Sequence, residues 1–278
     1  LGGISNQMME QKNENGYWMM YVGDRYGFHN ENYVYNQNII DIVMTGDSFT
    51  EGWSVKSEEN IGAVLQKFGF KVVNIGKAGN GSLIELAAIK EYAEQLKPKI
   101  VLWIYFINDL IDLSYEIKSL ILNKYLNDDG FSQNLISRQN EIDSVLINHV
   151  QFEWNKERER KRENESWINN WVIRILKLWN LRVRINLIPI PTTTSYPTSY
   201  PTYSTRPVFI DILKRSKQMV STWGGEMYFV YLPDIYRYST GNENPNREFV
   251  LQTVTELGIP IIDIHREVFN IHPDPMSL

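Results

Sequence analysis

The chain has 278 residues, enough for one large domain or for one core with a sizeable insertion. Apolar residues make up 43% of it, which supports a hydrophobic core, and 28 basic residues stand against 33 acidic ones for a net charge of −5. This balance argues against a nucleic-acid-binding protein that works by neutralising phosphates, and no apolar run approaches the roughly 18 to 20 residues that span a bilayer.

Cysteine is absent, which excludes disulfides, thiolate metal sites and a cysteine nucleophile. The four histidines are scattered and form no H-x-x-x-H pair, so we expect no metal site, and nothing predicts another cofactor. The one basic cluster, residues 156–162 (KERERKR), is interleaved with glutamates. It predicts a solvated helix face rather than a nucleic-acid patch.

Strands and helices alternate along most of the chain. Residues 1–38 are polar and rich in Asn, Gly and Tyr, and they predict an irregular lead-in. Strands are then predicted at 39–45, 71–75, 99–106, 226–232 and 259–264, and helices at 57–68 (with Ser57 as N-cap), 82–96, 209–222 and 246–257. This alternation predicts parallel β-α-β units, hence an open five-stranded α/β sheet covered on both faces.

About a hundred residues between the third and fourth strands break the alternation. Residues 111–190 predict a helical insertion, a cap or lid over one end of the sheet. Within it, Trp167, Trp171 and Leu178 lie at helical spacing and are expected to pack onto the core. Residues 191–207 (PTTTSYPTSYPTYSTRP) are a low-complexity linker, so the α/β core comprises 39–110 and 208–278.

Three strand ends carry polar residues, and in an open parallel sheet sites form outside the carboxyl ends of the strands. The first strand ends at GDSFTEG, which contains Ser48, the second at NIGKAGNG, which contains Gly79, and the third at FIND, which contains Asn108. Alone, the first and third stretches are equally typical of a turn, and the second is equally typical of a phosphate-binding loop, although it matches neither the P-loop nor the G-x-G-x-x-G pattern. Together they supply a hydroxyl, a glycine N–H and an amide, the groups that acyl transfer needs.

These three stretches resemble the first three motif blocks of the SGNH (GDSL-type) hydrolases. The resemblance implies a flavodoxin-like three-layer α/β/α sandwich, in agreement with the alternation. It also implies that Ser48 is the nucleophile, and that the N–H groups of Ser48 and Gly79 and the side chain of Asn108 bind the oxyanion. The third block departs from the family pattern, because Phe106 stands where the family has glycine.

The family's last block, Asp-x-x-His, has no match, because none of His29, His149, His265 and His272 has an aspartate three residues before it. We expect the histidine that acts as base to lie beyond Leu278. The alternatives are that His272 is the base, with Asp274 or Asp263 nearby, or that the protein lacks a base. Without a histidine partner, a serine hydroxyl is a poor nucleophile at neutral pH.

Upstream, residues 24–30 (DRYGFHN) resemble a D-x-x-G-F-x-N segment of some SGNH-like proteins of bacterial polysaccharide and envelope systems. The favoured hypothesis is therefore a serine esterase that removes an acyl group from a carbohydrate. The alternatives are an O-acyltransferase in polysaccharide modification and an inactive SGNH-fold binding protein. The sequence does not decide between an envelope and a cytoplasmic location, and it leaves the oligomeric state open.

Overall fold

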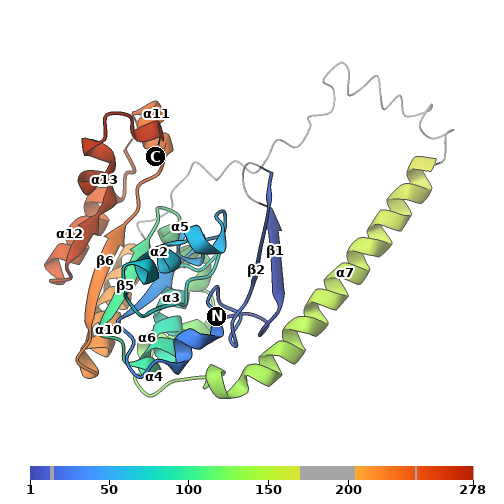
Figure 1. Cartoon of the computed structure of the whole chain (residues 1–278), viewed down its shortest axis with the longest axis horizontal. Coiled ribbons are helices and arrows are strands. Elements are labelled where there is room, and N and C mark those ends of the chain that lie inside the picture. Colours follow the sequence, from blue (N-terminus) through green and yellow to red (C-terminus); the bar gives the residue numbers. More distant parts are fainter. Residues whose placement is uncertain (13–15, 170–203, 242, 278) are drawn as a thin grey trace. The chain divides into compact units, whose positions relative to one another are not determined.

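The computed structural model describes residues 1–12, 16–169, 204–241 and 243–277 (Figure 1). The chain divides into two compact units, one formed by residues 1–142 and 201–278 and the other by residues 143–200. The first unit contains the sheet and all three predicted site residues. Among the described helices, none combines the length and the apolar character that a membrane span requires.

A five-stranded parallel sheet forms the centre of the first unit. Its strands, in chain order, are β3 (Ile42–Gly46), β4 (Val72–Asn74), β5 (Ile100–Tyr105), β6 (Glu226–Tyr231) and β7 (Ile261–Asp263). The spatial order is β4-β3-β5-β6-β7, the order of the flavodoxin-like sheet. After β3 the chain first moves outward to β4 and then returns to β5 on the other side. The carboxyl ends of β3 and β5 therefore flank the topological switch point, where such sheets place their binding sites.

Helices cover both faces of this sheet, as predicted. The longer helices of the first unit are α2 (Ile61–Lys67), α3 (Ser82–Ala88), α5 (Asp109–Glu116), α6 (Leu120–Asn127), α10 (Arg206–Thr222) and α12 (Arg247–Glu256). A π-helical turn (Ile89–Ala93) and α4 (Glu94–Leu96) continue α3. Three helices have only four or five residues, namely α1 (Ser48–Glu51), α11 (Tyr236–Thr240) and α13 (Ile264–Glu267). The 3-10 turns are Asn32–Asn36, Ser57–Glu59, Leu135–Arg138, Phe269–Ile271 and Pro275–Ser277.

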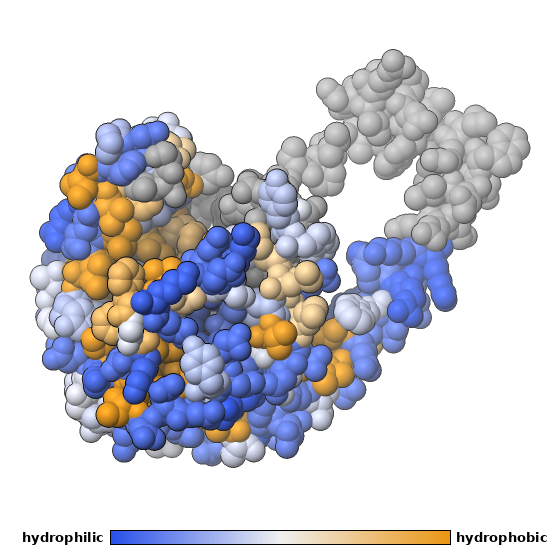
Figure 2. Space-filling model, viewed as in Figure 1, coloured by the Kyte–Doolittle hydropathy of each residue, from blue (hydrophilic) through white to orange (hydrophobic). Residues whose placement is uncertain are grey.

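The hydrophobic core lies mainly on one face of the sheet. There Trp103, Phe229 and Tyr231 pack with residues of α3 and α10, and all three are buried. The opposite face has a smaller cluster around Met44 and Ile104, which α2 covers. Its outer members, among them Ile100, Leu102 and Ile262, are only partly buried. Figure 2 shows apolar residues at the surface in the region of β5 and β6, so this second face is less completely covered.

The start of the first helix after β3 differs from the prediction. Ser57 was expected to cap it, but Ser57 begins a 3-10 turn and the helix α2 starts four residues later. Asn60 is the N-cap, and its side-chain oxygen accepts the Ala63 N–H at 2.8 Å. Asparagine is as good an N-cap as serine, so composition alone could not separate the two positions.

The lead-in is more regular than predicted. It contains an antiparallel hairpin of β1 (Met8–Lys12) and β2 (Trp18–Val22), in which Met8 pairs with Val22. In the sequence, the Asn15-Gly16 pair between the two strands is typical of a hairpin, although the strands themselves lack a clear apolar alternation. Gly16 has a φ of +84°, which glycine adopts without strain.

The predicted insertion is described only in part. It contains α5, α6 and the 31-residue helix α7 (Gln139–Asn169). On α7, Lys156 pairs with Glu153, and Arg160 with Glu157, as expected for charges on a helix surface. Trp171, Leu178 and most of the linker lie outside the described residues, and nothing is described of the Trp167 side chain. The lid therefore stays a prediction, and α10 begins at Arg206, inside the stretch assigned to the linker.

Candidate active site

The three predicted site residues follow the carboxyl ends of three neighbouring strands. Ser48 comes two residues after β3, Gly79 five residues after β4 and Asn108 three residues after β5. Since β4, β3 and β5 are adjacent and parallel, these segments leave the same edge of the sheet. The backbone N–H of Lys77, in the loop after β4, donates to the Gly46 carbonyl at the end of β3 at 3.1 Å. This bond joins the loop of Gly79 to the strand that precedes Ser48.

Asp47 shapes the turn that presents Ser48. Its carboxylate accepts the Phe49 N–H at 3.0 Å and so caps the short helix α1, whose first residue is Ser48. The Ser48 hydroxyl, half-buried, makes a long contact of 3.5 Å to the same carboxylate. Burial raises the pKa of Asp47, while hydrogen bonds from Phe49, from the Asn108 side chain and from Ser48 oppose that rise. Asp47 thus contacts both Ser48 and Asn108.

Gly79 occupies a tight turn. The N–H of Asn80 donates to the Lys77 carbonyl at 3.0 Å, and Gly79 has a φ of +80°, as the third residue of a type II turn requires. A Cβ at Gly79 would meet no atom within 4 Å, so the backbone conformation and not the available space favours glycine. In the described part of the chain the Gly79 N–H donates to no protein group, and the residue is exposed. That N–H is available to a ligand.

Gly76, at the start of the same loop, is required by close packing. A Cβ there would lie 2.5 Å from the Cβ of Thr50, a buried residue of α1. We expect Gly76→Ala to lower the free energy of unfolding by about 1 to 3 kcal/mol, because neither backbone can retreat easily. Gly130→Ala is the matched control, since a Cβ at Gly130 has its nearest neighbour at 3.6 Å. Urea unfolding of both variants tests this, and equal midpoints would contradict it.

The Asn108 side chain donates to carboxyl groups. Its Nδ2 lies 2.8 Å from Oδ2 of Asp112, one helical turn further along α5, and it also bonds to Asp47. Burial raises the pKa of Asp112 to about 6, and the bond from Asn108 opposes this. The amide that would bind an oxyanion therefore already has acceptors in this structure.

Phe106 stands where the SGNH block that FIND resembles has glycine, and its ring packs against another aromatic ring. Its ring centre lies 4.3 Å from that of Phe49, the residue after Ser48, and Phe49 is about half exposed. The Phe106 N–H donates to the buried Asp109 at 3.1 Å. Phe106 thus forms an aromatic pair with the residue that follows Ser48.

A group of buried carboxyls lies around these residues. Burial raises the pKa of Glu85 and of Asp109 well above their usual ranges, and the nearby carboxyls of Asp47 and Asp112 raise both further. Burial also raises the pKa of Glu116 to about 7, although three backbone N–H groups donate to it. Sequence reasoning missed Glu85, Asp112 and Glu116. The sequence signal for one of them was the four-residue spacing from Asn108 to Asp112, which places both side chains on one face of a helix.

None of the described histidines hydrogen-bonds to the Ser48 hydroxyl. Nδ1 of His272 lies 2.8 Å from the Asp274 carbonyl, within its own turn. His265 contacts the Tyr238 hydroxyl at 2.6 Å, and burial lowers its pKa. Asp263 pairs with Arg247 and caps α13. Neither His272 nor His265 is thus brought to Ser48, and the base stays a prediction.

The segment 24–30 is hydrogen-bonded to the end of β4, the strand that precedes the loop of Gly79. Asp24 is buried and accepts the N–H groups of Tyr26 and Phe28 at 2.8 and 3.0 Å. Asn30 bonds to both the N–H and the carbonyl of Asn74, each at 2.8 Å, and so fixes the end of β4. The side chains of Asp24 and Asn30 therefore stabilise this segment and attach it to β4.

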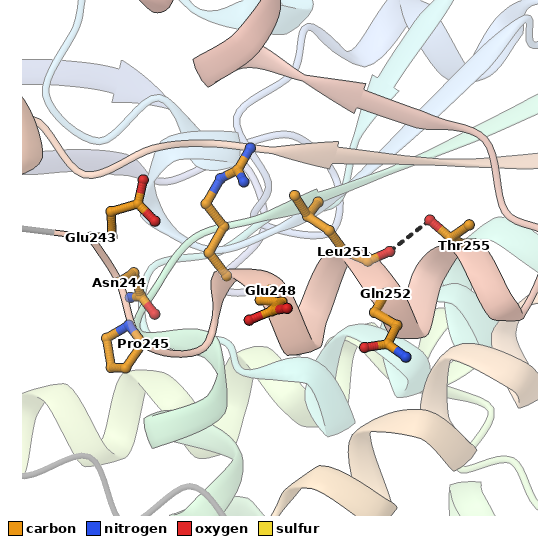
Figure 3. Close-up of a pocket in the computed structure, with 8 residues that line it drawn as sticks. Glu243, Asn244, Pro245, Glu248, Leu251, Gln252 and Thr255 are labelled. Carbon is orange, nitrogen blue, oxygen red and sulfur yellow. Dashed lines mark hydrogen bonds between the residues drawn. The ribbon is translucent and has the colours of Figure 1, made fainter.

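No described cluster of three or more His, Cys, Asp or Glu side chains fits a metal ion. Figure 3 shows a hollow along α12, and none of the three predicted site residues lines it. Its lining is Glu243, Asn244, Pro245, Arg247, Glu248, Leu251, Gln252 and Thr255.

The comparison with known proteins gives distant likenesses to solved structures. No family model matches the sequence, and no curated protein matches it. The solved crystal structure of TesA is similar to this chain, with a TM-score of 0.41 and 12% identity, over 84% of this chain and 83% of that one. A likeness this distant establishes neither a family nor an activity, and the fold rests on its own strand order.

Proposed function

We propose that this protein is a serine esterase that removes an acyl group from a carbohydrate. The observation that carries the proposal is the placement of Ser48, Gly79 and Asn108 after three adjacent strand ends at the switch point of the sheet. A hydroxyl, an unengaged N–H and a side-chain amide at one edge are the groups that acyl transfer uses.

In the proposed reaction, Ser48 Oγ bonds to the ester carbonyl carbon and gives its proton to a base. The carbonyl oxygen becomes an oxyanion, held by the N–H groups of Ser48 and Gly79 and by the Asn108 amide. The carbon–oxygen bond to the sugar then breaks, and the sugar oxygen takes the proton. Water hydrolyses the acyl-serine by the same steps. Among the described residues the Ser48 hydroxyl bonds only to Asp47, so no described histidine is assigned as the base.

Two features favour a carbohydrate ester over other esters. The segment 24–30 resembles one found in proteins of polysaccharide and envelope systems. The paired rings of Phe106 and of Phe49, the residue after Ser48, offer an aromatic surface of the kind on which the apolar face of a sugar can pack.

Labelling with a fluorophosphonate probe tests the nucleophile. We expect the full-length protein to be labelled at Ser48, because a serine in an oxyanion site reacts with phosphorus as it does with a carbonyl carbon. Peptide mass mapping identifies the residue, and Ser48→Ala should remove the label. Labelling of another serine, or equal labelling of both proteins, would contradict the proposal.

The second candidate is a non-catalytic binding protein with this fold. It is favoured by the engagement of the Asn108 amide with Asp112 and Asp47, which leaves negative charge where an oxyanion would form. Absence of labelling at Ser48 in the folded full-length protein would favour this candidate over the esterase.

A further inference from the structure

We propose that Glu51 is a positioning residue that holds the Gly79 N–H in place for the oxyanion. The inference rests on the proposed esterase function, and it adds a role that the three motif stretches do not assign. Glu51 is fully buried and is the last residue of α1, three residues after Ser48.

The Glu51 carboxylate binds the loop directly before Gly79. Its Oε2 accepts the N–H of Ala78 at 2.7 Å, and its Oε1 accepts the ammonium of Lys77 at 2.7 Å. The two residues that precede Gly79 in the turn are therefore both bonded to one buried side chain. A fixed Ala78 peptide leaves little freedom to the next peptide, which carries the Gly79 N–H.

A second carboxyl holds the other side of the turn. Glu116, on α5, accepts the N–H of Gly81 at 2.6 Å and that of Leu83 at 2.9 Å. The loop is thus bonded before and after Gly79, while the Gly79 N–H itself donates to no described protein group. Such donors act best when they are fixed before the substrate arrives.

Glu51 is itself fixed by the N-terminal hairpin. The Tyr21 hydroxyl, from β2, donates to Glu51 Oε1 at 2.5 Å, and the Tyr21 ring stacks on His29 with centres 3.7 Å apart. His29 Nδ1 lies 2.9 Å from the Glu51 carbonyl oxygen, so it is the protonated nitrogen. Burial and the neighbouring carboxylate raise the pKa of Tyr21, which keeps its hydroxyl a donor.

This arrangement costs desolvation energy. A buried carboxylate and ammonium are no better for stability than well-packed apolar residues, so stability alone does not explain the pair. What the pair does provide is a rigid link between the helix that begins with Ser48 and the loop that contains Gly79. Their relative position then sets the distance between nucleophile and oxyanion donor.

The test compares Glu51→Gln with Glu91→Gln in the full-length protein. Glu91 is a matched control, because it too is buried and accepts a tyrosine hydroxyl (Tyr125, 2.6 Å) and backbone N–H groups (Gln133, 2.6 Å; Leu135, 2.8 Å). Its partners are outside the site loops. The measurements are kcat and KM for p-nitrophenyl acetate, the Tm, and amide hydrogen exchange of the peptide covering residues 76–81.

We expect both variants to lower the Tm, but only Glu51→Gln to lower kcat. The expected loss is about 10- to 100-fold, below the 10²–10³ for complete removal of one oxyanion donor, and KM should stay within about twofold. Exchange in residues 76–81 should also rise in this variant alone. Glu51→Asp, which keeps the charge, should be intermediate, and it replaces Glu51→Gln should the latter fail to fold.

Three results would overturn the inference while leaving the esterase proposal intact. They are an unchanged kcat in Glu51→Gln, unchanged exchange in its residues 76–81, and an equal fall of kcat in Glu91→Gln. A wild-type protein no faster than Ser48→Ala would instead overturn the esterase proposal, and this inference with it.

Discussion

Replacing Ser48 with alanine is expected to lower kcat/KM for p-nitrophenyl acetate by about 10³-fold or more, since loss of a serine nucleophile removes the covalent route altogether. The substitution should leave the fold intact. Ser48 is half-buried, and its hydroxyl makes only the 3.5 Å contact to Asp47 among the described residues. Far-UV circular dichroism and the Tm of the variant check this.

Ser137→Ala is the matched control for this experiment. The Ser137 hydroxyl donates to the Asn134 carbonyl at 2.8 Å in an exposed turn, and it contacts none of the site residues. Its activity should equal that of the wild type. Equal rates for Ser48→Ala and the wild type would show that Ser48 is not the nucleophile.

The free energy of unfolding is expected to fall as the pH rises from about 4 to about 7. Burial raises the pKa of Asp112 from 3.8 to about 6 and that of Glu116 from 4.5 to about 7. In this window the folded protein holds protons that the unfolded chain releases, so raising the pH favours unfolding. Each proton that the folded protein binds and the unfolded chain releases lowers the free energy of unfolding by about 1.4 kcal/mol per pH unit. Urea unfolding at several pH values measures it.

Glu85 provides the sharpest variant for this experiment. It is fully buried, its pKa is raised well above the usual range by burial and by neighbouring acids, and no described group hydrogen-bonds to its carboxyl oxygens. Glu85→Gln should therefore reduce the slope at pH values above the ordinary glutamate pKa, by at most about 1.4 kcal/mol per pH unit. The control is Glu59→Gln, at an exposed position whose side chain makes a 3.9 Å surface contact with Lys56. A slope unchanged by Glu85→Gln would contradict the argument.

The core of the fold was predictable because its strands are apolar on both faces. The run at residues 39–45 and that at 99–106 correspond to β3 and β5, with ends shifted by one to three residues. The helix start at Asn60 was missed because several cap residues compete locally. The hairpin of β1 and β2 was missed because its strands lack a clear apolar alternation.

The site was predictable only as far as strand ends define it. Ser48, Gly79 and Asn108 each follow a strand, and parallel pairing alone brings those ends to one edge. Glu85 and Glu116 come from helices that meet only after folding, so no sequence spacing links them to Ser48. The engagement of Asn108 by Asp112 depends on a side-chain rotamer, which sequence patterns do not determine.

The contacts that the first 38 residues make with the sheet domain help to define where that domain begins. A boundary at residue 39, where the strand pattern starts, would keep the whole parallel sheet but remove Tyr21, His29 and Asn30. These side chains contact Glu51, the last residue of α1, and Asn74, the last residue of β4. Phe28 and Val34, which the same truncation would remove, are buried in the main hydrophobic core, so the truncation would also remove core packing, and the folded domain begins before residue 39.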